Sequence, residues 1–90
     1  MRLDDLVLFA KLAELQSFSA AARALGVPKQ TLSRRVMDLE ASLKVPLIQR
    51  TTRKVRLTEA GSAYAVRCQE IARLAKEANA AISSQSVEVS

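Results

Sequence analysis

The sequence predicts one small, mainly helical domain that carries a single short β-hairpin. Ninety residues provide material for one compact core. The composition is 49% hydrophobic with only two Gly and two Pro. It is therefore too apolar for a disordered chain and too poor in turn residues for an all-β fold. Apolar residues also recur every three or four positions, which is the spacing of a buried helix face.

Two helices are expected in the first third of the chain. Leu3, Leu6 and Phe9 fall on one face of a helix over about 4–15, and acidic residues occupy its first turn. Ser19 is a suitable N-cap for a short Ala-rich helix over 20–25, which Gly26 then ends. Small Ala side chains allow this second helix to lie close to a neighbouring helix.

A third helix is expected to follow directly, with Pro28 at its first position. Its apolar stripe falls on Leu32, Val36, Leu39 and Leu43, which leaves a polar, cationic face toward solvent. Pro46 follows the end of this helix, and 47–50 and 55–57 read as the two strands of a hairpin around a basic tip.

Thr58 is expected to cap a long final helix that runs to about residue 82. Such a helix of about 24 residues would be about 36 Å long, more than so small a body can cover. Its apolar stripe is therefore assigned to a dimer interface. The stripe consists of Tyr64, Cys68, Ile71, Leu74, Ala75, Ala78 and Ile82.

The composition argues against an enzyme and against a metalloprotein. The chain has no His and one Cys, so it lacks a disulfide framework, a cluster of thiol or imidazole metal ligands and an imidazole base for a nucleophile. The carboxylates of Asp38 and Glu40 point about 160° apart around a helix and do not form a catalytic pair.

No apolar stretch approaches the roughly 20 residues of a membrane-spanning helix, and the chain reads as cytoplasmic.

The surplus positive charge lies in one region. Residues 29–56 contain eight basic and two acidic side chains, whereas the rest of the chain contains six basic and seven acidic ones. Charge focused in this way is typical of a nucleic-acid-binding surface. Because a helix fits the major groove of B-DNA, Arg34 is a candidate to read guanine and Gln30 to read adenine. Further candidates are Lys29 and Thr31 for bases or phosphates, Ser33 and Arg35 for phosphates, and Arg53 and Lys54 at the hairpin tip for the backbone or a minor groove.

Several motifs in order resemble one family. Residues 18–27, 31–36, 39–43, 47–50 and 57–61 are similar to the N-terminal winged helix-turn-helix domain of LysR-type transcriptional regulators. The resemblance covers roughly residues 3–82. It implies a DNA-binding domain over 1–58 and a linker or dimerisation helix over 59–82. Residues 83–90 then form a polar tail or the start of a hinge to a C-terminal effector-binding domain.

The resemblance also implies partners and site residues. It implies a bacterial homodimer that reads an interrupted, A·T-rich inverted repeat in duplex DNA, and it leaves open a tetramer in the full-length protein and contact with RNA polymerase. A small-molecule effector would bind the C-terminal domain, so no cofactor is expected in this chain. The family's recognition positions fall on Lys29, Gln30, Thr31, Ser33 and Arg34, its wing arginine on Arg53, and a further arginine, expected to contact the DNA backbone, on Arg50.

Three positions depart from the family pattern. Pro28-Lys29-Gln30 stands where Ser-Gln-Pro commonly opens the recognition helix, which removes a capping hydroxyl and adds a positive charge. Lys44 stands where Gly is common, and Ile48 where Phe is common. Base preference, the exit of the helix and the packing under the wing are therefore expected to differ from the common pattern.

One alternative from another class is a winged-helix module whose basic face docks an acidic protein, because the fold alone does not fix the function. Such a surface should present aromatic anchors. The outward face of the third helix offers only Met37. The sequence therefore favours DNA as the partner.

Overall fold

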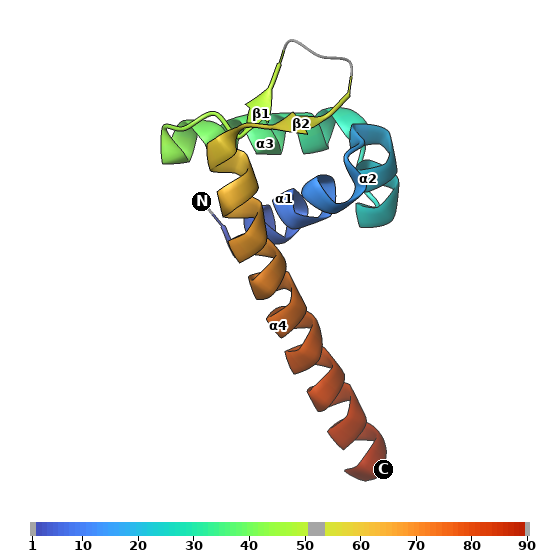
Figure 1. Cartoon of the computed structure of the whole chain (residues 1–90). Helices are drawn as coiled ribbons and strands as arrows, with labels where there is room; N and C mark the ends of the chain where they lie inside the picture. Colours follow the sequence, from blue (N-terminus) through green and yellow to red (C-terminus); the bar gives the residue numbers. More distant parts are fainter. Residues whose placement is uncertain (1, 51–53, 90) are drawn as a thin grey trace.

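A computed structural model describes residues 2–50 and 54–89, and side chains up to residue 84. The elements follow in the order α1 (Leu3–Leu15), α2 (Phe18–Leu25), α3 (Lys29–Leu43), β1 (Ile48–Gln49), β2 (Arg56–Leu57) and α4 (Glu59–Val89). Helices α1, α2 and α3 form the body, the two strands form a small wing, and α4 projects away from both (Figure 1). The predicted winged helix-turn-helix architecture is confirmed.

Helix α2 begins two residues earlier than predicted. Its N-cap is Ser17, whose side-chain oxygen accepts a hydrogen bond from the Ala20 N–H at 3.1 Å. The prediction that Ser19 caps this helix was wrong, because both serines are good caps and the local pattern does not distinguish them. Starting at residue 18 places Phe18 in the helix, where it packs against the hydrophobic core.

Helix α3 begins at Lys29, so Pro28 is its N-cap and not its first residue. The Pro28 carbonyl accepts the Leu32 N–H at 3.1 Å, although the pyrrolidine ring offers no capping acceptor of its own. The helix ends at Leu43, and its C-cap Lys44 adopts the left-handed conformation with φ 59°. Glycine adopts this conformation without strain, which accounts physically for the preference for Gly at this position in the family pattern.

The wing is a two-stranded antiparallel sheet in which Ile48 pairs with Leu57 and Gln49 with Arg56. Each strand is shorter than predicted. Ile48 stands where the family pattern commonly has the larger Phe. It is buried and lies in the core beneath the wing.

The core joins every helix of the body to the start of α4. Its largest fully buried side chains are Phe9, Leu12, Leu32, Leu39, Leu47, Val36 and Cys68. Helix α1 packs along α4, and this packing holds the body against the long helix. The stripe of Leu32, Val36 and Leu39 faces inward as predicted, and it fixes which side of α3 is left for solvent.

Helix α4 spans 31 residues. Thr58 caps it as predicted, with its hydroxyl oxygen accepting the Gly61 N–H at 2.9 Å. The prediction that the helix ends near residue 82 was wrong, since the backbone stays helical to Val89. Residues 83–89 contain neither Gly nor Pro, and a helix that has already nucleated propagates through such a polar segment at little cost.

Candidate nucleic-acid interface

The N-terminal half of α3 presents four of the predicted base-contacting residues to solvent. Lys29, Gln30, Thr31 and Arg34 are all exposed. Leu32 and Val36, on the opposite face, have no exposed surface and anchor α3 to the body. A polar, cationic helix face is thus held rigidly in place by apolar packing behind it.

Several of these side chains border a shallow hollow of about 360 Å³, lined by Gln30, Thr31, Arg34, Arg35 and Asp38. Ser33 and Arg35 are half-buried at the flanks of the exposed face. Asp38 places one negative charge beside Arg34, one helical turn along α3. The hollow therefore offers hydrogen-bond donors and acceptors of the kinds that pair with base edges.

The wing adds cations beside α3. Lys54 and Arg56 are exposed, and both border a second hollow of about 430 Å³ that reaches Gln16 and Ser62. Arg53, predicted as the wing arginine, lies outside the described residues. Arg56 was not among the predicted site residues, although the count of basic residues in 29–56 already contained it.

The Arg50 side chain is bound to helix α3. Its guanidinium forms an ion pair with the carboxylate of Glu40, and its side chain is 45% exposed against 13% for Glu40. The sequence excluded Glu40 from a catalytic pair and placed it in a segment that resembles the family, but this pairing was not predicted. The only available signal was a glutamate near the end of α3 followed ten residues later by an arginine, and that spacing does not reveal a contact.

The predicted dimer stripe divides into two parts. Cys68 has no exposed surface, and Tyr64 packs against Phe9 with ring centroids 5.9 Å apart, so both side chains serve the core of their own domain. Burial raises the pKa of the Cys68 thiol, which keeps it protonated at neutral pH. Further along α4, Ile71 and Ala75 are half-buried, while Leu74, Ala78 and Ile82 are exposed.

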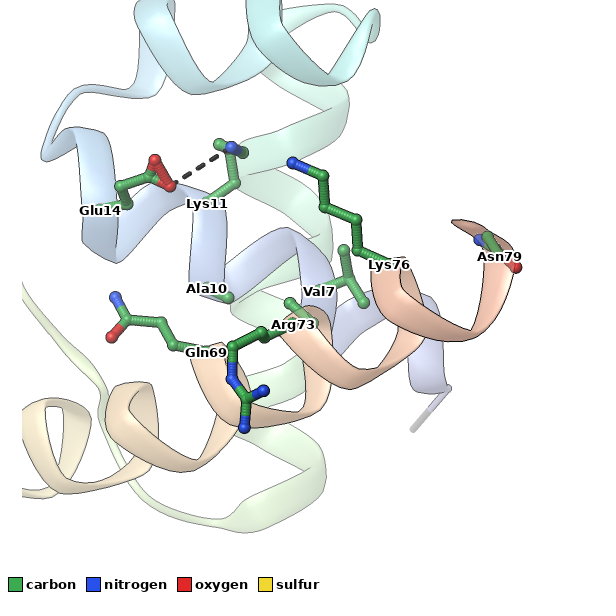
Figure 2. A pocket seen from close by; sticks show the side chains of 9 residues that line it. Val7, Ala10, Lys11, Glu14, Gln69, Arg73, Lys76 and Asn79 are labelled. Atoms are coloured by element: carbon green, nitrogen blue, oxygen red, sulfur yellow. Dashed lines mark hydrogen bonds and ion pairs between the residues drawn. The ribbon is translucent and has the colours of Figure 1, made fainter. Parts of the chain in front are cut away.

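A groove of about 730 Å³ runs between α1 and α4 (Figure 2). Val7, Ala10 and Ala72 provide its apolar lining, and Lys11, Glu14, Gln69, Arg73, Lys76 and Asn79 complete it. Two of the three lining cations are in ion pairs: Lys11 with Glu14 at 3.3 Å, and Arg73 with Glu77, outside the lining, at 3.1 Å. The groove is therefore less cationic than its composition suggests.

Residues 2–50 and 54–89 contain no group of three or more His, Cys, Asp or Glu side chains that could hold a metal ion. In the same residues, no helix combines the length and hydrophobicity needed to cross a bilayer.

A helix-turn-helix with an exposed cationic second helix and a basic wing defines the class of winged helix-turn-helix nucleic-acid-binding domains. The family described as "Bacterial regulatory helix-turn-helix protein, lysR family" matches residues 3–62. The chain belongs to this family of transcriptional regulators, which are not enzymes.

Individual relatives and solved structures resemble this chain in sequence and in fold. An HTH-type transcriptional regulator of Xanthomonas campestris pv. campestris (strain 8004) is 50% identical over 80 residues, covering 89% of this chain and 23% of the relative. The structure of the Vibrio cholerae virulence activator AphB matches with TM-score 0.83 and 34% identity, over 91% of this chain and 28% of that one. A complex of the BenM DNA-binding domain with catB site 1 DNA matches with TM-score 0.75 and 30% identity, over 100% of this chain and 97% of that one. The chain thus spans about a quarter of the length of the curated relatives it matches.

Proposed function

We propose that this domain binds duplex DNA sequence-specifically as a homodimer, with α3 in the major groove and the wing beside it. The observation that carries the proposal is the exposed row of Lys29, Gln30, Thr31 and Arg34 on a helix whose other face is anchored in the core. The match to a BenM domain in complex with DNA supports the same partner.

Each side chain has a defined role in this proposal. Arg34 donates two hydrogen bonds to guanine, Gln30 pairs with adenine, and Lys29 and Thr31 contact neighbouring base edges. The remaining set contacts the sugar–phosphate backbone or a minor groove: Ser33, Arg35, Arg50, Arg53 and Lys54. Among the described residues of α3, Met37 is the only large hydrophobic side chain that is exposed, which weighs against an acidic protein as the partner.

The dimer is formed through α4, so that two copies of α3 address an interrupted inverted repeat. The exposed apolar residues Leu74 and Ile82, together with Ala78, support this interface. The rest of the protein is included in the proposal: a C-terminal domain that binds a small-molecule effector, a tetramer of the full-length protein, contact with RNA polymerase, and location in the cytoplasm.

Selection of binding sites from a random duplex pool near 150 mM salt tests the function directly. We expect enrichment of an inverted repeat, and an affinity for it that falls by about 10³ or more between 50 and 200 mM salt. Selection without any enriched motif, and with salt-sensitive binding to all sequences, would contradict sequence-specific recognition by this domain.

Replacing Arg34 by Ala is expected to weaken binding to the selected site by about 1–3 kcal/mol and to relax the preference at one base position. Lys54→Ala is the matched control, because it also removes one exposed cation. It should weaken binding to all sequences alike and reduce the salt slope by about 1. Affinity measured against a panel of single-base variants separates the two. Equal losses on every sequence for Arg34→Ala would contradict its base-reading role.

A further inference from the structure

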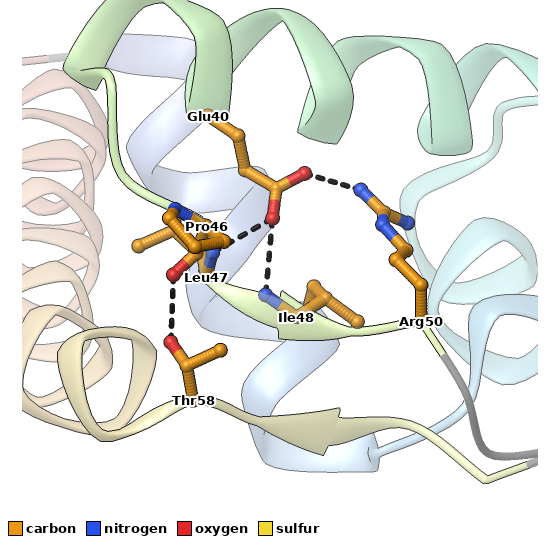
Figure 3. Close-up of polar contacts among 6 residues, drawn as sticks. All are labelled: Glu40, Pro46, Leu47, Ile48, Arg50 and Thr58. Carbon is orange, nitrogen blue, oxygen red and sulfur yellow. Dashed lines mark hydrogen bonds and ion pairs between the residues drawn. The ribbon is translucent and has the colours of Figure 1, made fainter.

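The base of the wing is held by one carboxylate from the recognition helix. Glu40 lies in the last turn of α3, and its Oε2 accepts the Leu47 N–H at 2.7 Å and the Ile48 N–H at 3.1 Å. Its Oε1 accepts a hydrogen bond from the guanidinium of Arg50. The Glu40 side chain thus binds two backbone N–H groups and the Arg50 side chain at the start of the wing (Figure 3).

The opposite side of the same segment is fixed by Thr58. Its hydroxyl donates to the Pro46 carbonyl at 2.7 Å, and its N–H donates to the Leu47 carbonyl at 2.9 Å. The Leu47 side chain is 2% exposed and serves the core. The N–H groups of Leu47 and Ile48 are therefore bonded to α3, and the carbonyls of Pro46 and Leu47 are bonded to Thr58 at the start of α4.

Besides these contacts, apolar packing attaches the wing to the body, through the buried Ile48 and the partly buried Val55 and Leu57. The sheet itself contains two residue pairs, which is too little to define a position independently of the body. Within the part of the chain that the structure describes, the hydrogen bonds and the ion pair of the half-buried Glu40 carboxylate all lie in this cluster. Glu40 is therefore placed to act on DNA binding through the geometry of the wing.

We propose that Glu40 is a positioning residue for DNA recognition: its carboxylate locks the wing and the Arg50 guanidinium onto α3, so that helix and wing meet the duplex as one rigid surface. This inference rests on the proposed function. It assigns Glu40 a role opposite to the one its charge implies, since a carboxylate beside a DNA-binding surface repels phosphate.

Replacing Glu40 by Gln separates the two roles. The amide oxygen of Gln can still accept both N–H groups of Leu47 and Ile48, whereas its NH₂ group faces the Arg50 guanidinium, donor against donor. The change also removes one negative charge, which by electrostatics alone would tighten binding. A positioning role predicts the opposite sign: affinity for the selected site about tenfold weaker and a salt slope lower by about 1, although no cation has been removed.

Glu59→Gln is the matched control. It is the same chemical change at an exposed position in the first turn of α4, next to Thr58 and outside the Glu40 cluster. Binding by this variant should equal or slightly exceed that of the wild type. The melting temperature of Glu40→Gln should stay within about 5 °C of the wild type, because the backbone hydrogen bonds survive.

If Glu40→Gln melts too low for a binding measurement, the double variant Glu40→Gln/Arg50→Ala decides. It leaves no unpaired guanidinium, and the proposal expects it to bind no more tightly than Arg50→Ala alone. Tighter binding by the double variant would mean that Glu40 acts only as a repelling charge, and would overturn the proposal.

The outcomes separate this inference from the function beneath it. Wild-type binding to the selected site with unweakened binding by Glu40→Gln overturns only the positioning role. Failure of the wild type to bind any duplex specifically overturns the proposed function and the inference together. A weaker Glu40→Gln beside an unchanged Glu59→Gln supports the positioning role.

Discussion

Replacing Gly61 by Ala is expected to lower the free energy of unfolding by about 3 kcal/mol. Gly61 is buried in the first turn of α4, directly against the segment that leads into the wing. A Cβ atom there would lie 2.1 Å from the Leu47 carbonyl oxygen and 2.9 Å from its carbon. Both are backbone atoms, so no flexible side chain can move aside.

This loss of stability is the opposite of what helix propensity predicts for a change from Gly to Ala. In an ordinary helix interior Ala is more favourable than Gly by about 1 kcal/mol, so propensity alone predicts stabilisation. Relief of the clash requires the Leu47 carbonyl to move, and that carbonyl also accepts the Thr58 N–H. The cost therefore includes strain at the cap of α4 and at the base of the wing.

Gly26→Ala is the control for this change. Gly26 has φ 70°, and a Cβ there would have nothing within 4 Å. Only backbone strain of about 1 kcal/mol is expected. Urea denaturation of the three proteins measures both differences. If Gly61→Ala were as stable as the wild type or more stable, the backbone at Leu47 would have to move away without cost. That result would contradict close packing between Gly61 and Leu47.

Much of the architecture could be predicted because local signals are strong in this chain. The spacing of Leu32, Val36 and Leu39 identifies the buried face of α3, and the polar face follows from it. Thr58 was identifiable as a cap from its residue type and position. The start of α2 was missed because Ser17 and Ser19 are equivalent by local criteria, and packing of Phe18 decides between them.

The parts of the site that could not be predicted depend on contacts between distant residues. Nothing local to Glu40 indicates that its carboxylate binds the amides of Leu47 and Ile48, since this requires knowledge of how the chain returns after α3. Cys68 is a second example, because helix periodicity alone does not distinguish a core residue from an interface residue. The helical stripe groups Cys68 with Ile82 in one dimer interface, whereas the structure places the fully buried Cys68 in the core of its own domain.

This division of the stripe defines where the dimer interface is expected. Leu74 is 56% exposed and Ile82 is 68% exposed, and with Ala78 between them they form an exposed apolar strip along one side of α4, as a helix–helix interface requires. Replacing both by Glu places two charges in the proposed interface, where they would be desolvated without partners. We expect the double variant Leu74→Glu/Ile82→Glu to be a folded monomer.

The loss of the dimer should appear mainly in DNA binding. Two linked copies of α3 bind an inverted repeat about 10²–10⁴ times more tightly than one copy binds a half-site, because the second contact is intramolecular. The double variant should therefore bind the full repeat no better than a half-site, while its affinity for the half-site stays unchanged. Molar mass from sedimentation equilibrium, combined with titrations of both duplexes, measures each part.

Val66→Glu is the matched control for an added charge on α4. Val66 is 55% exposed, close to the value for Leu74. It lies about 120° around the helix from Ala78, at the centre of the stripe, by the periodicity of 3.6 residues per turn. This variant should remain dimeric and retain its preference for the full repeat. A dimeric double variant, or a Val66→Glu protein that dissociates equally, would place the interface on another face of α4.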